Sequence, residues 1–450
     1  MSALAKYPRD QLSWWQLSSP SDREFHQNLE GEHTFDVAIV GAGFTGLWSA
    51  YYLKRLAPEL KICVLERDGV GYGASGRNGG WCAGSLTGTN AAYEKKANGG
   101  ALAMMRAMHD TVDEVGRVAQ FEGIDCEFAK GGALYVAVNA AQSKTLQKMA
   151  RDDLDHGADP ADVKVLNAQD TRSRLNIANI REGLYFPNCA AIHPFKLARG
   201  LARVVAESGV SIFEQTEVRE IGTQVLTTSN GTVKAGAIIR ATEGYGSTIK
   251  GHERAIAPIH STMIMTQAFS DAHWDEIGLR HREVFADGRN LFFHGLRTED
   301  GRMALGGLGA LYRLGSSTQL HQPTIAASAA RLKALAEDLF PSLGPIEIVH
   351  QWAGAVGVPR DQVPSVGFDK DSGFAWGGGY LGEGVAAANL AGRCLADLIT
   401  ERDSDLVRLP WVNHRSPNWE PEPIRWAGIA AMRGVMAASD WLAQSSSRDT

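Results

Sequence analysis

The fold is decided by the stretch FDVAIVGAGFTGLWSAYYLKRLAPELKICVLE, residues 35–66. Phe35–Val40 and Lys61–Glu66 are short, apolar and rich in β-branched residues, which predicts two buried strands. Between them, apolar residues from Phe44 to about Ala57 recur at helical spacing, which predicts a helix. A strand, a helix and a second strand in this order form a βαβ unit, and such a unit implies a parallel sheet.

Glycines stand where the first strand turns into its helix. Gly41 permits the tight turn, Gly43 lets the backbone approach a pyrophosphate, and Gly46 lets the helix pack closely on the strand. Glu66 ends the second strand, where a carboxylate accepts hydrogen bonds from the ribose hydroxyls of an adenosine. The pattern therefore predicts dinucleotide binding, with the phosphates at the helix N-terminus. The residues predicted to make these contacts are Gly41, Gly43, Phe44, Thr45, Gly46, Glu66 and Arg67.

Composition excludes several classes of protein. The 45 basic and 51 acidic residues give a net charge of −6, so nucleic acid and anionic membranes are poor partners. The five cysteines are scattered without a CxxC pair, which predicts no disulfide framework, no metal site and a reducing compartment. The first residues lack the apolar core of a signal peptide, and no apolar run is long enough to span a bilayer. We therefore expect a soluble, cytoplasmic protein, and the oligomeric state stays open.

The rest of the chain alternates between two kinds of pattern. A helix from Pro194 and a strand over Ala235–Thr242 continue the α/β pattern, whereas segments such as Ala257–Gln267 are typical of antiparallel strands. We expect an α/β protein (α+β overall), in which a discontinuous Rossmann-like nucleotide-binding domain carries an inserted mixed, mainly antiparallel β-sheet substrate domain. The expected boundaries are 1–34 for an N-terminal extension, 35–90, 186–250 and 345–400 for the nucleotide-binding domain, 91–185 and 251–344 for the substrate domain, and 401–450 for a C-terminal tail with a helix.

A second glycine-rich loop suggests which dinucleotide is bound. Residues 73–80 read GASGRNGG, and the first fingerprint extends to GxGxxGxxxAxxL through Ala50 and Leu53. Together these motifs resemble the FAD-dependent D-amino-acid oxidase (DAO) superfamily, and its glycine oxidase and gamma-glutamylputrescine oxidase branch in particular. The cofactor implied by this resemblance is FAD.

Later segments match the same superfamily in register. They are AIHP at 191–194, TEV at 216–218, ATEG at 241–244, WAG at 352–354 and GYLGEGV at 379–385. In the last of these, the glycines bring backbone N–H groups to a helix N-terminus, which stabilises the negative charge of a reduced flavin. The FAD contacts implied by the resemblance are Ser75, Gly76, Arg77, Asn78, Gly79, Gly80, Val218, Thr242, Gly244, Gly354, Gly379, Tyr380, Gly382, Glu383, Gly384 and Val385.

The resemblance also implies a reaction. A hydride passes from the carbon of a CH–NH bond to flavin N5, water hydrolyses the imine, and oxygen is reduced to hydrogen peroxide. We therefore expect an FAD-dependent amine or amino-acid oxidase, of EC 1.4.3 or 1.5.3 type, with a small-molecule substrate and O2 as acceptor. Relatives of the sarcosine oxidase type carry a flavin-linking cysteine shortly after the position of Trp352. Here Ala353–Ala355 holds none, so we expect non-covalent FAD.

Three residues are candidates for catalysis. His294 stands where related amine oxidases often have an arginine that clamps a substrate carboxylate, which favours an amine without that carboxylate or one held elsewhere. Trp352 is a candidate aromatic wall beside the flavin. His260 lies on a strand expected to cross the flavin, but alternation leaves open whether its face or that of Ser261 meets the substrate. Core packing is the alternative for Trp352, and a satisfied polar residue is the alternative for each histidine.

Two other functions stay open. One is an FAD-dependent 2-hydroxy-acid dehydrogenase that passes electrons to a quinone or a carrier protein. The other is a non-catalytic flavin-binding subunit that assembles with a partner chain. Fold analogy alone does not choose between them.

Overall fold

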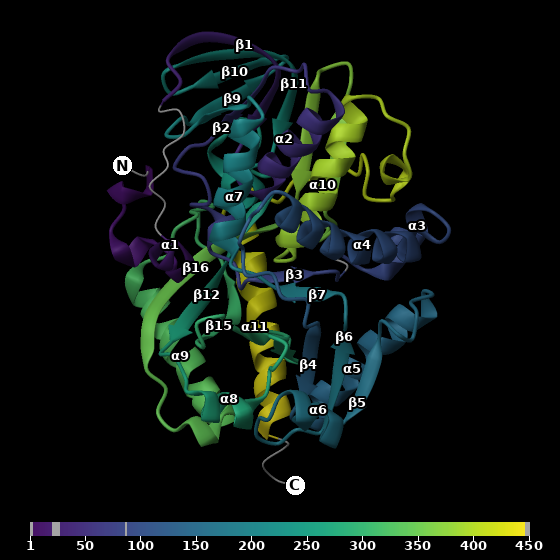
Figure 1. Cartoon of the computed structure of the whole chain (residues 1–450), viewed down its shortest axis with the longest axis vertical. Coiled ribbons are helices and arrows are strands. Elements are labelled where there is room, and N and C mark those ends of the chain that lie inside the picture. Colours follow the sequence, from purple (N-terminus) through teal and green to yellow (C-terminus); the bar gives the residue numbers. More distant parts are fainter. Residues whose placement is uncertain (1–2, 20–27, 86–87, 446–450) are drawn as a thin grey trace.

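The computed structural model describes residues 3–19, 28–85 and 88–445. Two large sheets lie one above the other in Figure 1, the first with α2, α7 and α10 at the top and the second with α8 and α9 at the bottom. Parts of the predicted N-terminal extension, residues 1–2 and 20–27, lie outside the described residues. Among the described residues, no helix combines the length and the apolarity needed to cross a bilayer. The cytoplasmic location stays a prediction.

The first sheet confirms the βαβ unit. Its strands run in the order β17-β18-β11-β1-β2-β8, and β9 and β10 extend it beside β11. β1 lies parallel to both β2 and β11. The bounds are β1 (Gly31–Val40), β2 (Ile62–Leu65), β8 (Ser211–Phe213), β9 (Val218–Gly222), β10 (Val225–Thr228), β11 (Gly231–Arg240), β17 (Ser365–Asp369) and β18 (Phe374–Gly378).

Helices cover this sheet because their apolar residues recur on one face. In α7 (Pro194–Glu207), Leu197, Leu201 and Val205 are fully buried. α2 (Phe44–Leu56) and α10 (Gly384–Ile399) pack very closely, since a Cβ on Gly392 would come within 2.7 Å of the Trp48 backbone. α4 (Gly100–Phe121) packs on α10, and α3 (Asn90–Lys96) precedes α4.

The second sheet is mixed and mainly antiparallel, as predicted. Its order is β16-β12-β15-β14-β13-β4-β6-β5, and only the β13–β4 pair is parallel among these neighbours. The bounds are β4 (Ala133–Ala137), β5 (Lys164–Asn167), β6 (Glu182–Phe186), β12 (Ala257–Thr266), β13 (Val284–Asp287), β14 (Phe293–Arg297), β15 (Met303–Leu311) and β16 (Ile348–Val358). β16 belongs to this sheet, although the sequence grouped 345–400 with the first domain; its antiparallel pairing with β12 decides this.

The remaining elements frame the two sheets. A small two-stranded sheet of β3 (Trp81–Ala83) and β7 (Cys189–Ala191) lies between them. The second sheet is flanked by α5 (Ala140–Asp155), α6 (Ala168–Arg174), α8 (Asp271–Ile277) and α9 (Gln322–Leu339). The chain ends contribute α1 (Trp14–Ser18) and α11 (Ile424–Ser445).

Candidate active site

One cavity of about 680 Å³ extends from the glycine-rich end of the first sheet to the second sheet. This volume is within the range of cavities that hold cofactors and small ligands. Residues from β1, β2, β12, β16, α2 and α10 line it, together with the loops between them. The fold therefore brings the separate glycine motifs of the sequence to one place.

The first glycine motif leaves the N-terminus of α2 open toward the cavity. Gly41 has φ +106°, and a Cβ there would come within 2.7 Å of the Ala241 carbonyl oxygen. A Cβ on Gly46 would overlap the carbonyl oxygen of Gly41, so these two positions require glycine. Gly43 is the N-cap residue and has no side chain to cap the helix. A phosphate is the ligand that such a helix end favours.

Glu66 follows the end of β2 and borders the same cavity. Its Oε2 accepts a hydrogen bond from the backbone N–H of Ala42 and its Oε1 from that of Asp68, both at 2.9 Å. Burial raises its pKa to about 7. The carboxyl group thus stands beside the first glycine loop, where the sequence predicts the ribose contact.

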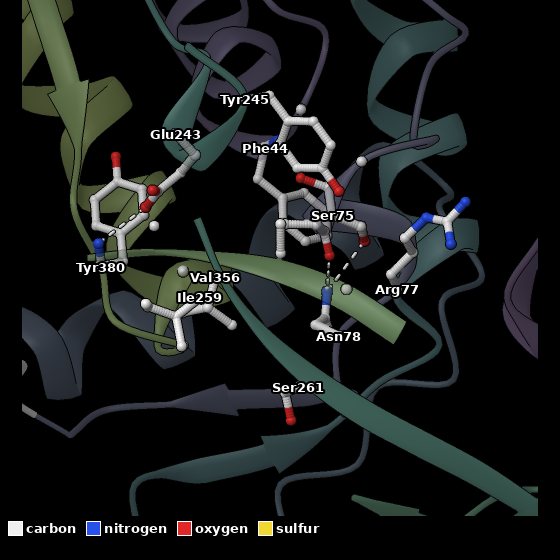
Figure 2. Close-up of a pocket in the computed structure, with 18 of the residues that line it drawn as sticks. Phe44, Ser75, Arg77, Asn78, Glu243, Tyr245, Ile259, Ser261, Val356 and Tyr380 are labelled. Atoms are coloured by element: carbon white, nitrogen blue, oxygen red, sulfur yellow. Dashed lines mark hydrogen bonds between the residues drawn. The ribbon is translucent and has the colours of Figure 1, made fainter. Parts of the chain in front are cut away.

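The second glycine loop, residues 73–80, is held both by its own side chains and by hydrogen bonds to residues outside it. Asn78 Nδ2 donates to the carbonyl oxygens of Ala74 and Ser75 at 3.2 and 3.1 Å, and Figure 2 shows the Asn78 side chain turned back into its loop. Arg77 Nε donates to the carbonyl oxygen of Tyr72 at 2.7 Å. Ser75 Oγ accepts from the Phe44 backbone N–H at 2.8 Å, which joins this loop to α2. Backbone carbonyl groups therefore accept hydrogen bonds from much of the Arg77 guanidinium.

The third glycine loop, residues 378–385, is joined to the turn after β11. Glu243 Oε1 accepts a hydrogen bond from the Tyr380 backbone N–H at 2.9 Å, and Figure 2 shows the two residues side by side. The Tyr380 hydroxyl lies 3.0 Å from Thr45 Oγ1. Glu383 is the N-cap residue of α10 and makes no side-chain cap hydrogen bond. Burial raises the pKa of Glu243 and that of Glu383 to about 7.

Most of the residues singled out in the sequence line this cavity. The exceptions are Gly46, Gly76, Gly80, Gly244, Gly379 and Trp352. The five glycines lie close behind the wall and shape it; Gly379, for example, has φ +82° and lies against the Pro359 ring. The FAD contacts of the individual residues stay predictions.

Trp352 lies behind the second glycine loop and not on the cavity wall. Its side chain is 1% exposed, and its indole N–H donates to the Arg77 carbonyl oxygen at 2.9 Å. Its ring packs edge-on against Trp15, with centroids 6.3 Å apart. These contacts favour the alternative of core packing that supports the loop, and a place for Trp352 beside the flavin stays a prediction.

One face of β12 brings Ser261 and Met263 to the cavity. His260 also borders the cavity, but its Nε2 donates to the Ser317 carbonyl oxygen at 2.8 Å. Burial lowers the pKa of His260. Residues of both faces of the strand thus border the cavity, and the hydrogen bond of His260 favours the alternative of a satisfied polar residue.

The end of the cavity at the second sheet is aromatic. His294 lies edge-on to Trp81, with ring centroids 5.9 Å apart, and 5.4 Å from Phe292. Tyr135 lies edge-on to Trp81, with ring centroids 6.3 Å apart. We call Trp81, Tyr135, Phe292 and His294 the aromatic cluster. A Cβ on Gly79 would come within 2.9 Å of His294 Cε1, so the cluster touches the second glycine loop.

The aromatic cluster carries no permanent positive charge. Burial lowers the pKa of His294 to about 4, so its imidazole is neutral near pH 7. Among the described residues, the arginines and lysines that line the cavity are Arg67 and Arg77 alone. Arg67 pairs with Asp68 at 3.0 Å, and Arg77 donates to backbone carbonyls. The cluster therefore offers no cationic clamp for a carboxylate.

Sequence reasoning missed several of the lining residues. Trp81 directly follows the second glycine loop, and that adjacency was a usable signal. Tyr135 and Tyr245 come from a strand and a turn whose position beside the cavity depends on long-range packing. Met436 comes from the C-terminal tail, where the sequence shows only an amphipathic stretch.

The residues fit an FAD. The N-cap residues of α2 and α10 make no side-chain cap hydrogen bond, and both helix N-termini border one cavity. Oε2 of Glu243 is a buried polar atom without a hydrogen-bond partner among the described residues. Such helix ends favour the pyrophosphate and the electron-rich edge of a flavin. The fold and the cavity together define a protein built to bind a flavin dinucleotide.

Comparisons with known proteins agree. The sequence model of the family described as FAD dependent oxidoreductase (DAO) matches residues 36–398. The chain belongs to this family, and its cofactor is FAD. The superfamily resemblance seen in the sequence is thereby confirmed.

Similar proteins extend over most of the chain. The probable oxidoreductase OrdL of Rhizobium meliloti (strain 1021) is 27% identical over 402 residues, covering 88% of this chain and 89% of that protein. The gamma-glutamylputrescine oxidoreductase of Escherichia coli (strain K12) is 27% identical over 387 residues, covering 84% and 87%. The solved structure of glycine oxidase from Geobacillus kaustophilus superposes with a TM-score of 0.71 at 19% identity, covering 85% and 99%.

Proposed function

We propose that this protein oxidises the CH–NH bond of an amine, with the amine bound at the aromatic cluster. One observation carries the proposal: the cavity that fits FAD ends at a cluster of neutral aromatic side chains. Similarity to proteins known as gamma-glutamylputrescine oxidoreductase and glycine oxidase supports an amine or amino acid as substrate. When bound, FAD supplies the acceptor for the hydride that leaves the carbon next to the amine nitrogen.

The residues of the chain have separate tasks in this reaction. The N-terminus of α2 holds the pyrophosphate, and that of α10 stabilises negative charge. Trp81, Tyr135 and Phe292 surround the carbon chain of the amine and exclude water. His294, which is neutral, accepts a hydrogen bond from the amine N–H and does not repel a cationic substrate.

The substrate that we propose lacks a carboxylate next to its amine. A carboxylate buried without a cationic partner or hydrogen bonds is strongly disfavoured. The aromatic cluster provides no arginine or lysine among the described residues. The same observation weighs against the 2-hydroxy-acid dehydrogenase, whose substrate carries such a carboxylate.

Oxygen as the acceptor and non-covalent FAD belong to the same proposal. All five cysteines are buried, and none of them lines the cavity. Acid precipitation of the holoprotein should therefore release FAD into the supernatant. Flavin that stays with the precipitated chain would contradict this expectation.

The test of the function is the visible spectrum of the holoprotein without oxygen. We expect primary or secondary amines, and not 2-hydroxy acids, to bleach the flavin absorbance. Admitting air should restore the absorbance and produce hydrogen peroxide. Bleaching by a hydroxy acid alone would identify the dehydrogenase, and a flavin that neither class of compound bleaches would favour the non-catalytic subunit.

A further inference from the structure

The C-terminal helix lies beyond the residues matched by the family, which end at 398. α11 nevertheless runs along the second sheet, as the yellow helix of Figure 1 shows, and its Met436 lines the cavity. We propose that α11 is part of the substrate site. Met436 is a specificity-determining residue that limits the size of the amine, and Asp440 is a positioning residue for the loop beside it. This inference rests on the proposed function, since it names a wall of the amine site.

One face of α11 points toward the body of the protein. The residues of this face recur every three or four positions, which is the helical repeat. They are Arg425, Ile429, Arg433, Met436 and Asp440. Ile429 is 7% exposed, and Arg433 Nε donates to the carbonyl oxygen of Gly309 at 3.4 Å. Gly309 itself lines the cavity, so the middle of α11 is fixed beside the wall.

Asp440 holds the loop of residues 288–292, which joins β13 to β14. Its Oδ1 accepts hydrogen bonds from the backbone N–H and from Nδ2 of Asn290, both at 2.9 Å. Its Oδ2 accepts from the backbone N–H of Leu291, also at 2.9 Å. At the base of the loop, Asp287 Oδ1 accepts from the Phe293 N–H at 3.0 Å. The loop is therefore fixed from both sides by carboxylates.

This loop connects α11 to the aromatic cluster. Asn290, Leu291 and Phe292 line the cavity, as Met436 does. Phe292 is 50% exposed, which places it at the mouth, and its ring lies 5.4 Å from that of His294. Moving the loop would therefore move one wall of the substrate site. A methionine beside it is a flexible, apolar surface that suits a carbon chain.

The test of Met436 compares Met436→Ala with Val435→Ala in the holoprotein. Val435 is the neighbouring residue on α11 and is 70% exposed, which makes it a matched control. The first readout is anaerobic flavin reduction by n-alkylamines of increasing length. We expect Met436→Ala to raise the ratio of kcat/KM for long amines to kcat/KM for short amines by about tenfold. Met436→Trp should shift the ratio in the opposite direction.

The second readout needs no substrate turnover. We expect acrylamide to quench flavin fluorescence more strongly in Met436→Ala than in the parent protein or Val435→Ala, because the wall is opened. Asp440→Ala should also increase quenching and raise KM for amines while kcat changes little. Asp440→Asn, which keeps one acceptor oxygen, should increase quenching and KM less than Asp440→Ala does.

The two readouts separate the two claims. If no amine reduces the flavin but the quenching differs as expected, the proposed function fails and the place of α11 at the cavity wall stands. If quenching and chain-length preference are the same in Met436→Ala and Val435→Ala, the inference is overturned. Loss of thermal stability in the Asp440 variants without a change in KM or quenching would reduce Asp440 to a structural contact.

Discussion

At the scale of single residues, the cavity buries three carboxyl groups. Burial raises the pKa of Glu66, Glu243 and Glu383 to about 7 each. In the unfolded chain a glutamate ionises near pH 4.3. Between these values the folded FAD-free protein holds more protons than the unfolded chain. Its stability therefore falls as the pH rises, by about 1.4 kcal/mol per pH unit for each such group.

Glu243→Gln tests this pH dependence. The substitution removes one titrating group and keeps an acceptor for the Tyr380 N–H. We expect the fall in unfolding free energy between about pH 5 and pH 7 to become shallower by about 1.4 kcal/mol per unit. Urea unfolding of the FAD-free protein across this range measures it. Glu59→Gln, at an exposed position, is the control, and equal slopes in both variants would contradict the assignment.

A second residue-scale prediction concerns Gly46. A Cβ there would overlap a backbone carbonyl oxygen, which a side-chain rotation cannot relieve. We expect Gly46→Ala to lower the unfolding free energy by about 1–3 kcal/mol and to reduce the FAD content of the purified protein. Gly428→Ala is the matched control, because a Cβ on that α11 glycine meets nothing within 4 Å. A Gly46→Ala protein with full FAD content would refute the close approach of α2 and β1.

At the scale of elements, α1 supports the second glycine loop from behind. Trp15 Nε1 donates to the Asn78 carbonyl oxygen at 2.9 Å, and Ser13 Oγ donates to that of Gly76 at 2.6 Å. Trp15→Phe removes the first of these bonds and should cost about 1 kcal/mol of stability. We also expect weaker FAD binding, measured by titration of the FAD-free protein. Trp14→Phe, one position earlier and half-buried, should leave FAD affinity unchanged. Equal losses of FAD affinity in both variants would contradict the support of the second glycine loop by α1.

The sequence predicted elements whose requirements are local. The βαβ unit and the helix of the tail follow from periodicity, and the glycine loops follow from backbone geometry that few other residues adopt. It did not predict contacts that depend on long-range packing. Strand alternation on β12 left two faces open, and in the folded chain both His260 and Ser261 border the cavity, with His260 bonded to the Ser317 carbonyl oxygen. The contacts of Trp352 are also long-range: its ring packs on Trp15 and its indole N–H donates to the Arg77 carbonyl oxygen.

At the scale of the whole molecule, segments near both ends of the chain help to build the central cavity. The family match leaves out residues before 36 and after 398. Yet α1 packs behind the second glycine loop, and α11 brings Met436 to the wall of the cavity. No sequence motif in either segment predicts this role, because it depends on how these segments pack on the rest of the folded chain. The part of the cavity where we propose that the amine binds is thus lined by residues of β3, β4, β14 and α11, which are far apart in the sequence.

The measurement that tests the central claim most directly compares two substrates that differ by one carboxylate. Putrescine and ornithine share an amine-bearing carbon chain, and only ornithine carries the carboxylate. We expect putrescine to reduce the bound FAD anaerobically with a second-order rate constant at least about tenfold higher, because the aromatic cluster gives a carboxylate no cationic partner. Faster reduction by ornithine would contradict the account and would mean that another group in the cavity binds the carboxylate.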